Sequence, residues 1–243
     1  YLYLAHQKEG LEPVSMLPED MTVQDQESDS FLKYYSKDQK RPKEKKTRAF
    51  QIRRKKKDGN HLHVHESVVS VKEVLKRSRE LGVSMTVFLT AVFLKAIHEE
   101  MSKMQEKKPI VLMVPVNLRK FFPSTSMLNF FNWIEPGYDF SKRDRSFEEV
   151  LGYTKDFFEE QLTKEKMSAH INDLLALELH PILRLAPLEL KNLCINAGAK
   201  FSEKNTTAIF SNMSAVRMPD SYVSYIERFG VFTNTPKLEL CLC

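Results

Sequence analysis

A continuous apolar run bounded by prolines is the feature that most constrains how this chain folds. The run spans residues 109–116, reads PIVLMVPV and contains no polar side chain. A strand with one wet face alternates between apolar and polar residues, whereas a strand covered on both faces reads as an unbroken apolar run. The run therefore predicts a central strand with other elements packed against both of its faces.

Two helices are predicted before this strand. Ser70 is suited to be the N-cap of the first helix, Glu73 completes a capping box with it, and apolar residues recur on one helical face until Gly82. Ser84 or Thr86 begins the second helix, which carries so little polar surface that we expect it to be buried. The first helix is thus expected at the surface and the second in the core.

The remaining segments indicate a mixed sheet. Alternation in residues 49–53 and 61–65 predicts a β-hairpin, and a capping box at Ser146 predicts one long helix to about residue 177, broken near Met167. A further helix is predicted from Pro187 to about residue 197. A turn is predicted at residues 136–137, and strands are predicted at residues 127–134, 206–212 and 222–232, with strand-like residues at 238–243. This order indicates an α/β fold, here an α+β two-layer sandwich with flanking helices.

The positive charge of the chain is concentrated in one segment. The sequence has 37 Lys and Arg against 32 Asp and Glu, a formal net charge of +5. Residues 36–57 contain 12 of the basic and two of the acidic residues, so the rest of the chain has 25 basic and 30 acidic residues, a net charge of −5. A like-charge block is typically a solvated connection. The alternative is a patch for an anionic partner, namely RNA, an acidic carrier protein or coenzyme phosphates.

We expect no nucleic-acid partner, because residues 36–47 have no interleaved aromatic residues of the kind that single-strand binding favours. The three cysteines, Cys194, Cys241 and Cys243, do not form a disulfide framework, which favours a reducing, cytoplasmic location. No segment approaches the roughly 20 apolar residues that a membrane span needs, and the start of the chain lacks the features of a signal peptide.

The histidines do not form a known catalytic or metal-binding signature. His61, His63 and His65 would project from one face of a strand, which is compatible with a metal site, but the pattern matches no ligand motif and we expect a wet strand face. His98 and His180 are interpreted as structural or capping residues. We therefore predict no metal site and no bound cofactor. Phosphate-binding loops and common hydrolase motifs are also absent.

The composition divides the chain into two parts. Residues 1–47 form an acidic and then basic connection, which we expect to be partly mobile, and residues 48–243 form the folded body. The chain begins without methionine and ends in a strand that nothing caps, so we expect it to be cut at both ends.

Four strings occur in an order that resembles a known group of enzymes. They are the helical segment 70–91, VPVNLR at residues 114–119, LNFF at residues 128–131 and FSN at residues 210–212. Together they resemble the second half of the condensation-domain and chloramphenicol-acetyltransferase-like superfamily, closest to its alcohol acetyltransferase and polyketide-associated acyltransferase branch. The resemblance covers most of residues 48–232 and implies a chloramphenicol-acetyltransferase-like half-domain.

The resemblance implies an enzyme with two α/β halves and a substrate tunnel between them. Its catalytic base is a histidine in a His-His-x-x-x-Asp-Gly motif of the first half, which takes the proton of the acceptor alcohol as it attacks a thioester. This chain lacks the motif: before the pair Asp58-Gly59, Arg53 and Arg54 occupy the two histidine positions, and a guanidinium does not act as a base at neutral pH. We therefore predict no catalytic residue in these 243 residues and an inactive isolated chain.

The resemblance also implies five substrate-binding positions, each placed just past a strand where a polar group can line a tunnel. They are Asn117, Arg119, Asn129, Ser211 and Asn212. For Arg119 the alternative is a structural ion pair with a neighbouring acid. Relatives usually carry glycine two residues after the last asparagine, where this chain has Ser214, so the backbone there is expected to differ.

Three functions follow as hypotheses. The first is part of an acyltransferase that moves an acyl group from acyl-CoA or an acyl carrier protein to a small alcohol, completed by a missing N-terminal half or by a second copy of the chain. The second is a catalytically inert binding or interaction module of the same fold. The third, nucleic-acid binding through the basic block, ranks last. In the first two cases we expect an exposed apolar patch on the sheet and helices.

Overall fold

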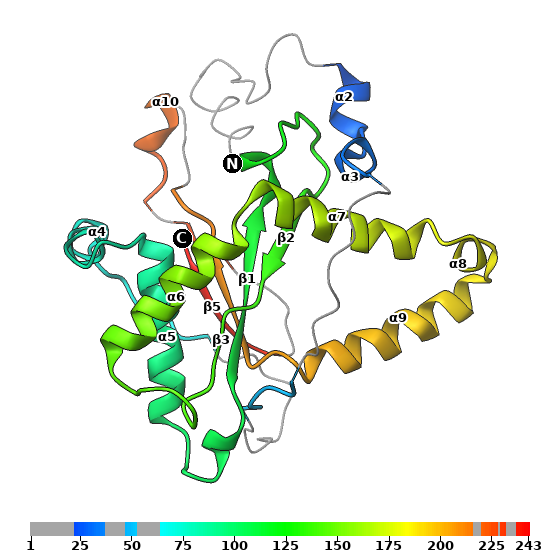
Figure 1. Cartoon of the computed structure of the whole chain (residues 1–243). Helices are drawn as coiled ribbons and strands as arrows, with labels where there is room; N and C mark the ends of the chain where they lie inside the picture. Colours follow the sequence, from blue (N-terminus) through cyan, green and yellow to red (C-terminus); the bar gives the residue numbers. More distant parts are fainter. Residues whose placement is uncertain (1–21, 37–46, 53–63, 216–219, 228, 232–236) are drawn as a thin grey trace.

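The structure is a computed structural model that describes residues 22–36, 47–52, 64–215, 220–227, 229–231 and 237–243. Its sheet is built around β1 (Ile110–Asn117), which confirms the central strand that the apolar run predicts (Figure 1). Along β1 the residues Ile110, Leu112 and Val114 are buried, whereas the residues between them are only half-buried. One face of the strand is thus covered fully, and the other face only in part.

The sheet is mixed, as expected. Its strands follow the order β2-β1-β4-β5. β2 and β3 are both antiparallel to β1 and pair with it in the same register. Between these two strands, the Pro136 carbonyl accepts the Leu112 N–H of β1 at 3.0 Å. β4 is parallel to β1, and β5 is parallel to β4. The bounds are Phe131–Ile134 for β2, Gly137–Tyr138 for β3, Ala208–Asn212 for β4 and Leu238–Leu242 for β5.

Two helices supply the core on the covered side of the sheet. α5 (Met85–Glu99) packs against β1 and against α6 (Phe147–Gln161), and Leu94 of α5 is fully buried beside strand residues such as Leu112 and Phe210. The more polar α4 (Val71–Glu80) lies at the surface before α5. The Ser70 and Ser84 hydroxyls cap α4 and α5 by accepting the Glu73 and Val87 N–H groups. These two helices confirm the sequence-based expectation.

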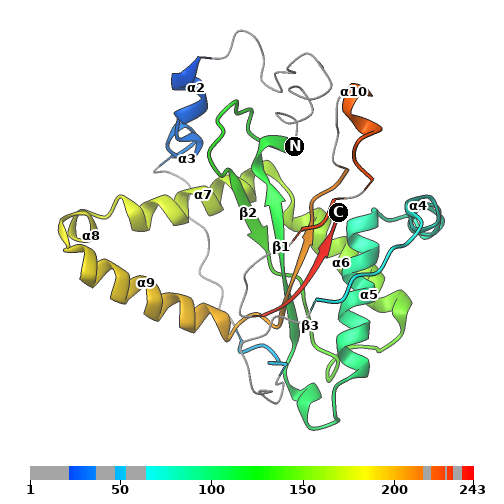
Figure 2. The same ribbon diagram turned by 180° about the vertical axis from the view of Figure 1, so that it is seen from behind.

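An arm of three helices extends from the body. α7 (Lys164–Glu178) leads away from the sheet, α8 (Pro181–Leu185) forms the tip and α9 (Leu188–Glu203) returns to the sheet (Figures 1 and 2). Leu188, Leu193 and Ile195 of α9 are each about two-thirds exposed, at 67%, 66% and 65%. Exposed apolar side chains thus occur on α9, while the apolar patch expected of a half-domain stays a prediction.

Several element boundaries differ from the predictions. The long helix breaks at Leu162 and Thr163, before the expected position Met167, because the Thr163 hydroxyl accepts the Lys166 N–H and starts a new helix. The helix after Pro187 continues to Glu203. The predicted strand at residues 127–134 is confined to β2, and Gly137 belongs to β3 rather than only to a turn.

The predicted hairpin and the predicted strand at residues 222–232 are wrong in the residues that the structure describes. Residues 49–52 and 64–65 of the expected hairpin are not strand; the Ala49 and Phe50 N–H groups donate to the carbonyls of Lys204 and Pro109, and the rest of the hairpin lies outside the described residues. The segment 222–232 begins inside α10 (Asp220–Val223) instead. The strand that pairs with β4 on the side away from β1 is β5.

Within the described residues, no helix has by itself the length and apolar composition of a membrane span; α4 and α5 meet that test only together, across a bend of 89°.

Candidate functional site

The predicted substrate-binding residues lie at one end of the sheet, at or near the carboxyl ends of β1 and β4. β1 and β4 are parallel neighbours, so their carboxyl ends lie at the same edge, where Asn117 ends β1 and Asn212 ends β4. β2 begins at this edge, since Phe131 pairs with Asn117, and Asn129 lies just before it. Loops at the carboxyl ends of parallel strands are a common place for ligand sites in α/β folds. The structure thus brings the positions together, while their contact with substrate stays a prediction.

Asn212 joins this edge to the first turn of α5. Its Nδ2 group donates to the Thr86 hydroxyl at 2.9 Å, and its Oδ1 atom accepts the Ser214 N–H at 2.9 Å. Ser214 has a φ angle of +62°, in the left-handed region that favours glycine. This conformation explains why the resemblance implies glycine at this position.

Asn117 and Arg119 organise the loop that follows β1. The Asn117 Oδ1 atom accepts the Arg119 N–H at 3.0 Å and so caps a short 3-10 turn at Leu118–Lys120. The Arg119 guanidinium donates to the carbonyls of Ser126 and Leu128 at 2.6 and 2.9 Å. The alternative considered for Arg119, an ion pair with an acid, is not found among the described residues; its guanidinium bonds two backbone carbonyls. Arg119 therefore holds the loop 121–130 against the strand end.

A short N-terminal segment packs over the same loop. It contains α2 (Val23–Glu27) and α3 (Ser30–Lys33). The Ser126 hydroxyl donates to the Ser28 carbonyl at 2.6 Å, the Met127 N–H donates to the Gln26 carbonyl at 2.8 Å, and the rings of Phe31 and Phe130 meet edge to face at 5.1 Å. This part of the 1–47 segment therefore belongs structurally to the candidate site. The boundary after residue 47 stays a prediction.

Asn129 and Ser211 differ in exposure. Asn129 is exposed in the loop before β2. Ser211 is half-buried and is paired in register with Cys241 of the neighbouring strand β5. Burial raises the pKa of the Cys241 thiol, with nearby Glu239 acting in the same direction, so this thiol is poorly suited to act as a nucleophile. Cys241 and Cys243 are free thiols, as the sequence predicts.

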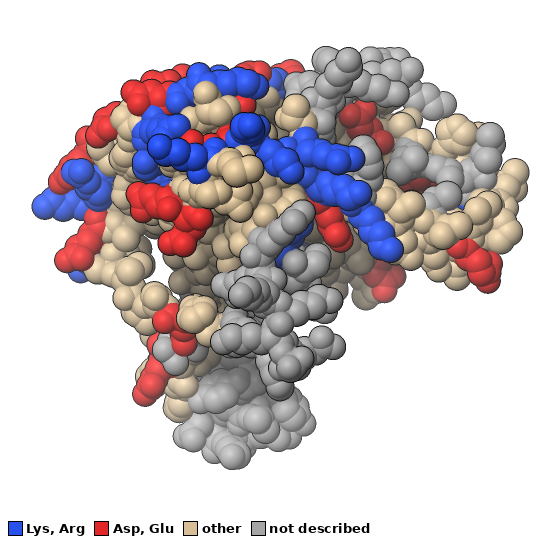
Figure 3. All heavy atoms as spheres, turned by 90° about the horizontal axis from the view of Figure 1, so that it is seen from below, with Lys and Arg blue, Asp and Glu red and all other residues tan. Residues whose placement is uncertain are grey.

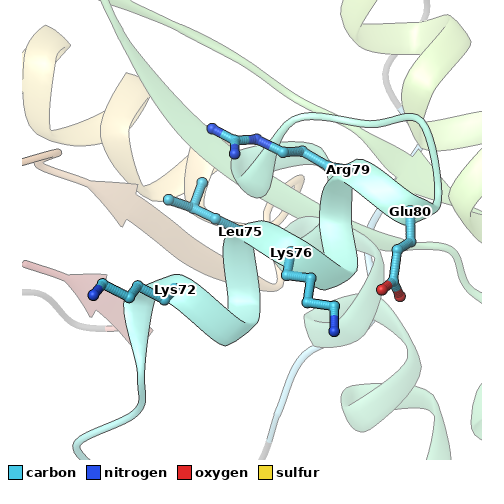
Figure 4. Close-up of a pocket in the computed structure, with 5 residues that line it drawn as sticks. All are labelled: Lys72, Leu75, Lys76, Arg79 and Glu80. Atoms are coloured by element: carbon cyan, nitrogen blue, oxygen red, sulfur yellow. The ribbon is translucent and has the colours of Figure 1, made fainter.

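A cationic face on α4 was not singled out by the sequence reasoning. Lys72, Lys76 and Arg79 are spaced at i, i+4 and i+7, so they share one side of the helix, and together with Leu75 and Glu80 they line a shallow pocket (Figure 4). The Glu80 carboxylate pairs with Arg77 at 3.3 Å. No described carboxylate pairs with the other three cations.

The cationic face of α4 lies near the end of the sheet where β1 and β4 have their carboxyl ends. α4 precedes the α5 turn that Asn212 holds, and both ribbon views place it at the level where β5 ends (Figures 1 and 2). The face seen from below carries basic and acidic side chains side by side (Figure 3). The spacing of the α4 cations was visible in the sequence, and only their lack of acidic partners required the structure.

The histidines with described side-chain contacts have structural partners. His98 is buried, stacks on Phe140 with ring centroids 3.9 Å apart and bonds Glu106 at 3.1 Å, while Glu106 also pairs with Arg145 at 2.8 Å. The structural interpretation of His98 is confirmed. In the part of the chain that the structure covers, no three His, Cys, Asp or Glu residues are placed to hold a metal ion, and His61 and His63 lie outside it.

Comparison with known proteins identifies the family. No curated protein and no solved structure matches the chain. A family model described as alcohol acetyltransferase matches residues 12–141, which is more than half of the 243 residues and includes β1, Asn117, Arg119 and Asn129. The matched segment contains α4, α5, β1 and the loop 121–130, whereas β4 with Ser211 and Asn212 lies beyond it. Because the match covers more than half of the chain, the chain belongs to the alcohol acetyltransferase family.

Proposed function

We propose that this chain is part of an acyltransferase that moves an acyl group from acyl-CoA to a small alcohol. Membership of the alcohol acetyltransferase family carries this proposal. The mixed sheet, with polar residues at the shared carboxyl edge of β1 and β4, supports it by offering one wall of a substrate channel. The proposed reaction breaks the thioester C–S bond, forms an ester C–O bond and moves the alcohol proton to the leaving thiolate.

The proposed reaction needs a base, and the histidine motif that would supply it does not occur in this sequence. A histidine would take the proton from the alcohol as its oxygen attacks the thioester carbonyl. The sequence has no His-His-x-x-x-Asp-Gly motif, and His98 is engaged with Glu106 and Phe140. We therefore propose that an N-terminal half supplies the base, and that this chain supplies binding surface through Asn117, Asn129 and Ser211.

The cationic face of α4 supports coenzyme A as the acyl donor. Lys72, Lys76 and Arg79 present three positive charges on one helix side without described acidic partners. Phosphate groups form charge-assisted hydrogen bonds with such side chains. We propose that this face binds the phosphates of the coenzyme. An acidic carrier protein could bind to the same three cations, so the experiment below compares coenzyme A with a carrier protein as the acyl donor.

Calorimetric titration of the chain with coenzyme A tests the donor. The double variant Lys72→Gln/Lys76→Gln should weaken binding at least tenfold, since charge-assisted bonds contribute about 1.5–3 kcal/mol each. Lys103→Gln, which removes one exposed lysine in the loop after α5 and does not touch the α4 pocket, is the matched control and should leave affinity unchanged. Binding that depends on an acidic carrier protein but not on coenzyme A would favour the carrier; no binding of either would contradict the proposal.

An inert binding module of the same fold is the second candidate. It is favoured by the structural bonds of Arg119 and Asn212, whose polar atoms are occupied by the Ser126 and Leu128 carbonyls and by Thr86 and Ser214. Thiol release from acetyl-coenzyme A by the protein as its source makes it, with and without a panel of alcohols, distinguishes the two. Alcohol-dependent release supports the enzyme, and its absence with retained coenzyme binding supports the module.

A further inference from the structure

We infer that α9 is an association surface, and that a second copy of this chain packs against it to form an antiparallel helix pair. α9 has 16 residues and forms the returning limb of the arm (Figures 1 and 2). Every residue of α9 whose burial the structure describes is exposed, except Lys191, which is half-buried. Within the described residues, the chain itself therefore covers no face of this helix.

An uncovered helix of this length lacks the usual source of helix stability. Isolated helices shorter than about 12–15 residues are marginal in water, and helices in proteins are stabilised mainly by the packing of one apolar face. α9 has such a face, which we call the α9 stripe: Leu190, Leu193 and Ala197 lie on one side of the helix at i, i+3 and i+7. Leu190 and Leu193 are 51% and 66% exposed. The α9 stripe is therefore an apolar surface that a partner can cover.

The charges beside the α9 stripe select the partner. Glu189 lies in the first turn of α9 and Lys200 in the last. They are 11 residues apart, which is about three helical turns, so both lie along the same flank of the stripe. Neither forms an ion pair with a described residue. The flank is thus negative at one end and positive at the other.

A second copy in the antiparallel direction is complementary to both the charges and the side-chain sizes. A two-fold axis at the middle of α9 places Glu189 of each copy beside Lys200 of the other, so two opposite-charge contacts form. The same axis places the large Leu190 of one copy opposite the small Ala197 of the other, with the two Leu193 side chains near the axis. A parallel pair would place Glu189 beside Glu189 and Lys200 beside Lys200, which is unfavourable.

The size of the contact sets the expected strength of the dimer. Sixteen helical residues span about 24 Å, and a helix is about 10 Å wide, so this contact is smaller than the usual area of about 800 Å² per partner. We therefore expect a weak dimer that forms as the protein concentration rises. The inference is independent of the proposed acyl transfer, because α9 contains none of the proposed substrate-binding residues.

Sedimentation equilibrium of the chain from about 1 μM to about 1 mM tests the association. The mean mass should rise from that of one chain towards that of two. Leu193→Gln should weaken the association at least tenfold, since it places a polar group at the centre of the apolar contact. Ile195→Gln is the matched control: Ile195 is equally exposed, at 65%, but lies on the other side of α9, so the dissociation constant should stay unchanged.

A charge swap tests the antiparallel register. Glu189→Lys and Lys200→Glu should each weaken the association about tenfold, because two attractive contacts become repulsive. The double variant Glu189→Lys/Lys200→Glu should restore it. Both substitutions place the unfavourable charge at an end of the helix dipole, so weakened helix formation would make the double variant worse than either single variant. Restored association therefore reports the pairing between copies.

Four results would overturn the inference. They are a mass that stays that of one chain up to about 1 mM, a double variant that associates no better than the single variants, an Ile195→Gln variant as weak as Leu193→Gln, and protection of α9 from hydrogen exchange in a protein that remains monomeric as its source makes it. The last result would assign the α9 stripe to another part of that protein or to a different partner.

Discussion

Replacing Ser214 by glycine should stabilise the fold. Ser214 has a φ angle of +62° directly after the strand that carries Asn212. A non-glycine residue in the left-handed region destabilises the folded state by about 1–2 kcal/mol. Glycine avoids this strain but lowers stability by about 0.4–1 kcal/mol, because it increases the conformational entropy of the unfolded chain. The Ser214 N–H bond to the Asn212 side chain is a backbone contact and remains in the glycine variant. We expect a net gain of about 0.5–1 kcal/mol in the free energy of unfolding.

Denaturant unfolding measures this gain, with an unchanged slope showing that the same surface is exposed. Ser168→Gly, inside the helix α7, is the matched control and should lose about 0.5 kcal/mol, because glycine is a poor helix former. Ser214→Val should destabilise by about 1 kcal/mol or more, since branched side chains rarely adopt positive φ. A glycine variant at 214 that loses as much stability as the control would refute the left-handed conformation.

Three further predictions concern the loop, the core and the start of α6. Arg119→Ala should lower the free energy of unfolding by about 1–2 kcal/mol through loss of two carbonyl bonds, and Arg119→Lys should recover only part of it; equal stability of both variants and the parent would contradict the anchoring role. Leu94→Ala should cost about 3 kcal/mol in chemical unfolding, against about 0.5 kcal/mol or less for the exposed Val92→Ala. Hydrogen bonds from the Ser146 and Arg145 backbone N–H groups lower the pKa of Asp144 in the folded protein. The contribution of the Asp144 carboxylate to the free energy of unfolding is therefore complete above its unfolded pKa of about 3.9, and it is lost as the pH falls through the lower folded pKa. Asp144→Asn should therefore flatten the decline of stability below about pH 4, and an unchanged decline would count against this assignment.

Local signals in the sequence were sufficient for the centre of the fold. The unbroken apolar run identified β1, and the serine caps identified the starts of α4 and α5, because both signals depend on residues near one another in the chain. The grouping of Asn117 and Asn212 followed from their positions after strands, once β1 and β4 are known to be parallel. The break at Thr163 was also readable, since threonine is a good N-cap.

Other features depended on contacts between distant segments. The aromatic alternation after residue 222 favours a strand, but Asp220–Val223 forms a helical turn, and β4 pairs with β1 and β5. The Ala49 and Phe50 N–H groups donate to the carbonyls of Lys204 and Pro109, and residues 49–52 are not strand. Similarly, the partners of Arg119 are two backbone carbonyls of a loop, which no pattern of side chains indicates.

The parallel pairing of β1 with β4 has a consequence for how the chain reaches its native state. The Val111 N–H bonds the Thr207 side chain across 96 residues of chain, so this pairing closes a large loop that contains α6, α7, α8 and α9. Loop closure of this size is slow relative to the formation of neighbouring helices and of the β1–β2 pair. During synthesis, the side of β1 that pairs with β4 must therefore stay unpaired until β4 has emerged. An unpaired strand edge can pair with another chain, so misassembly between nascent chains would begin at this side of β1.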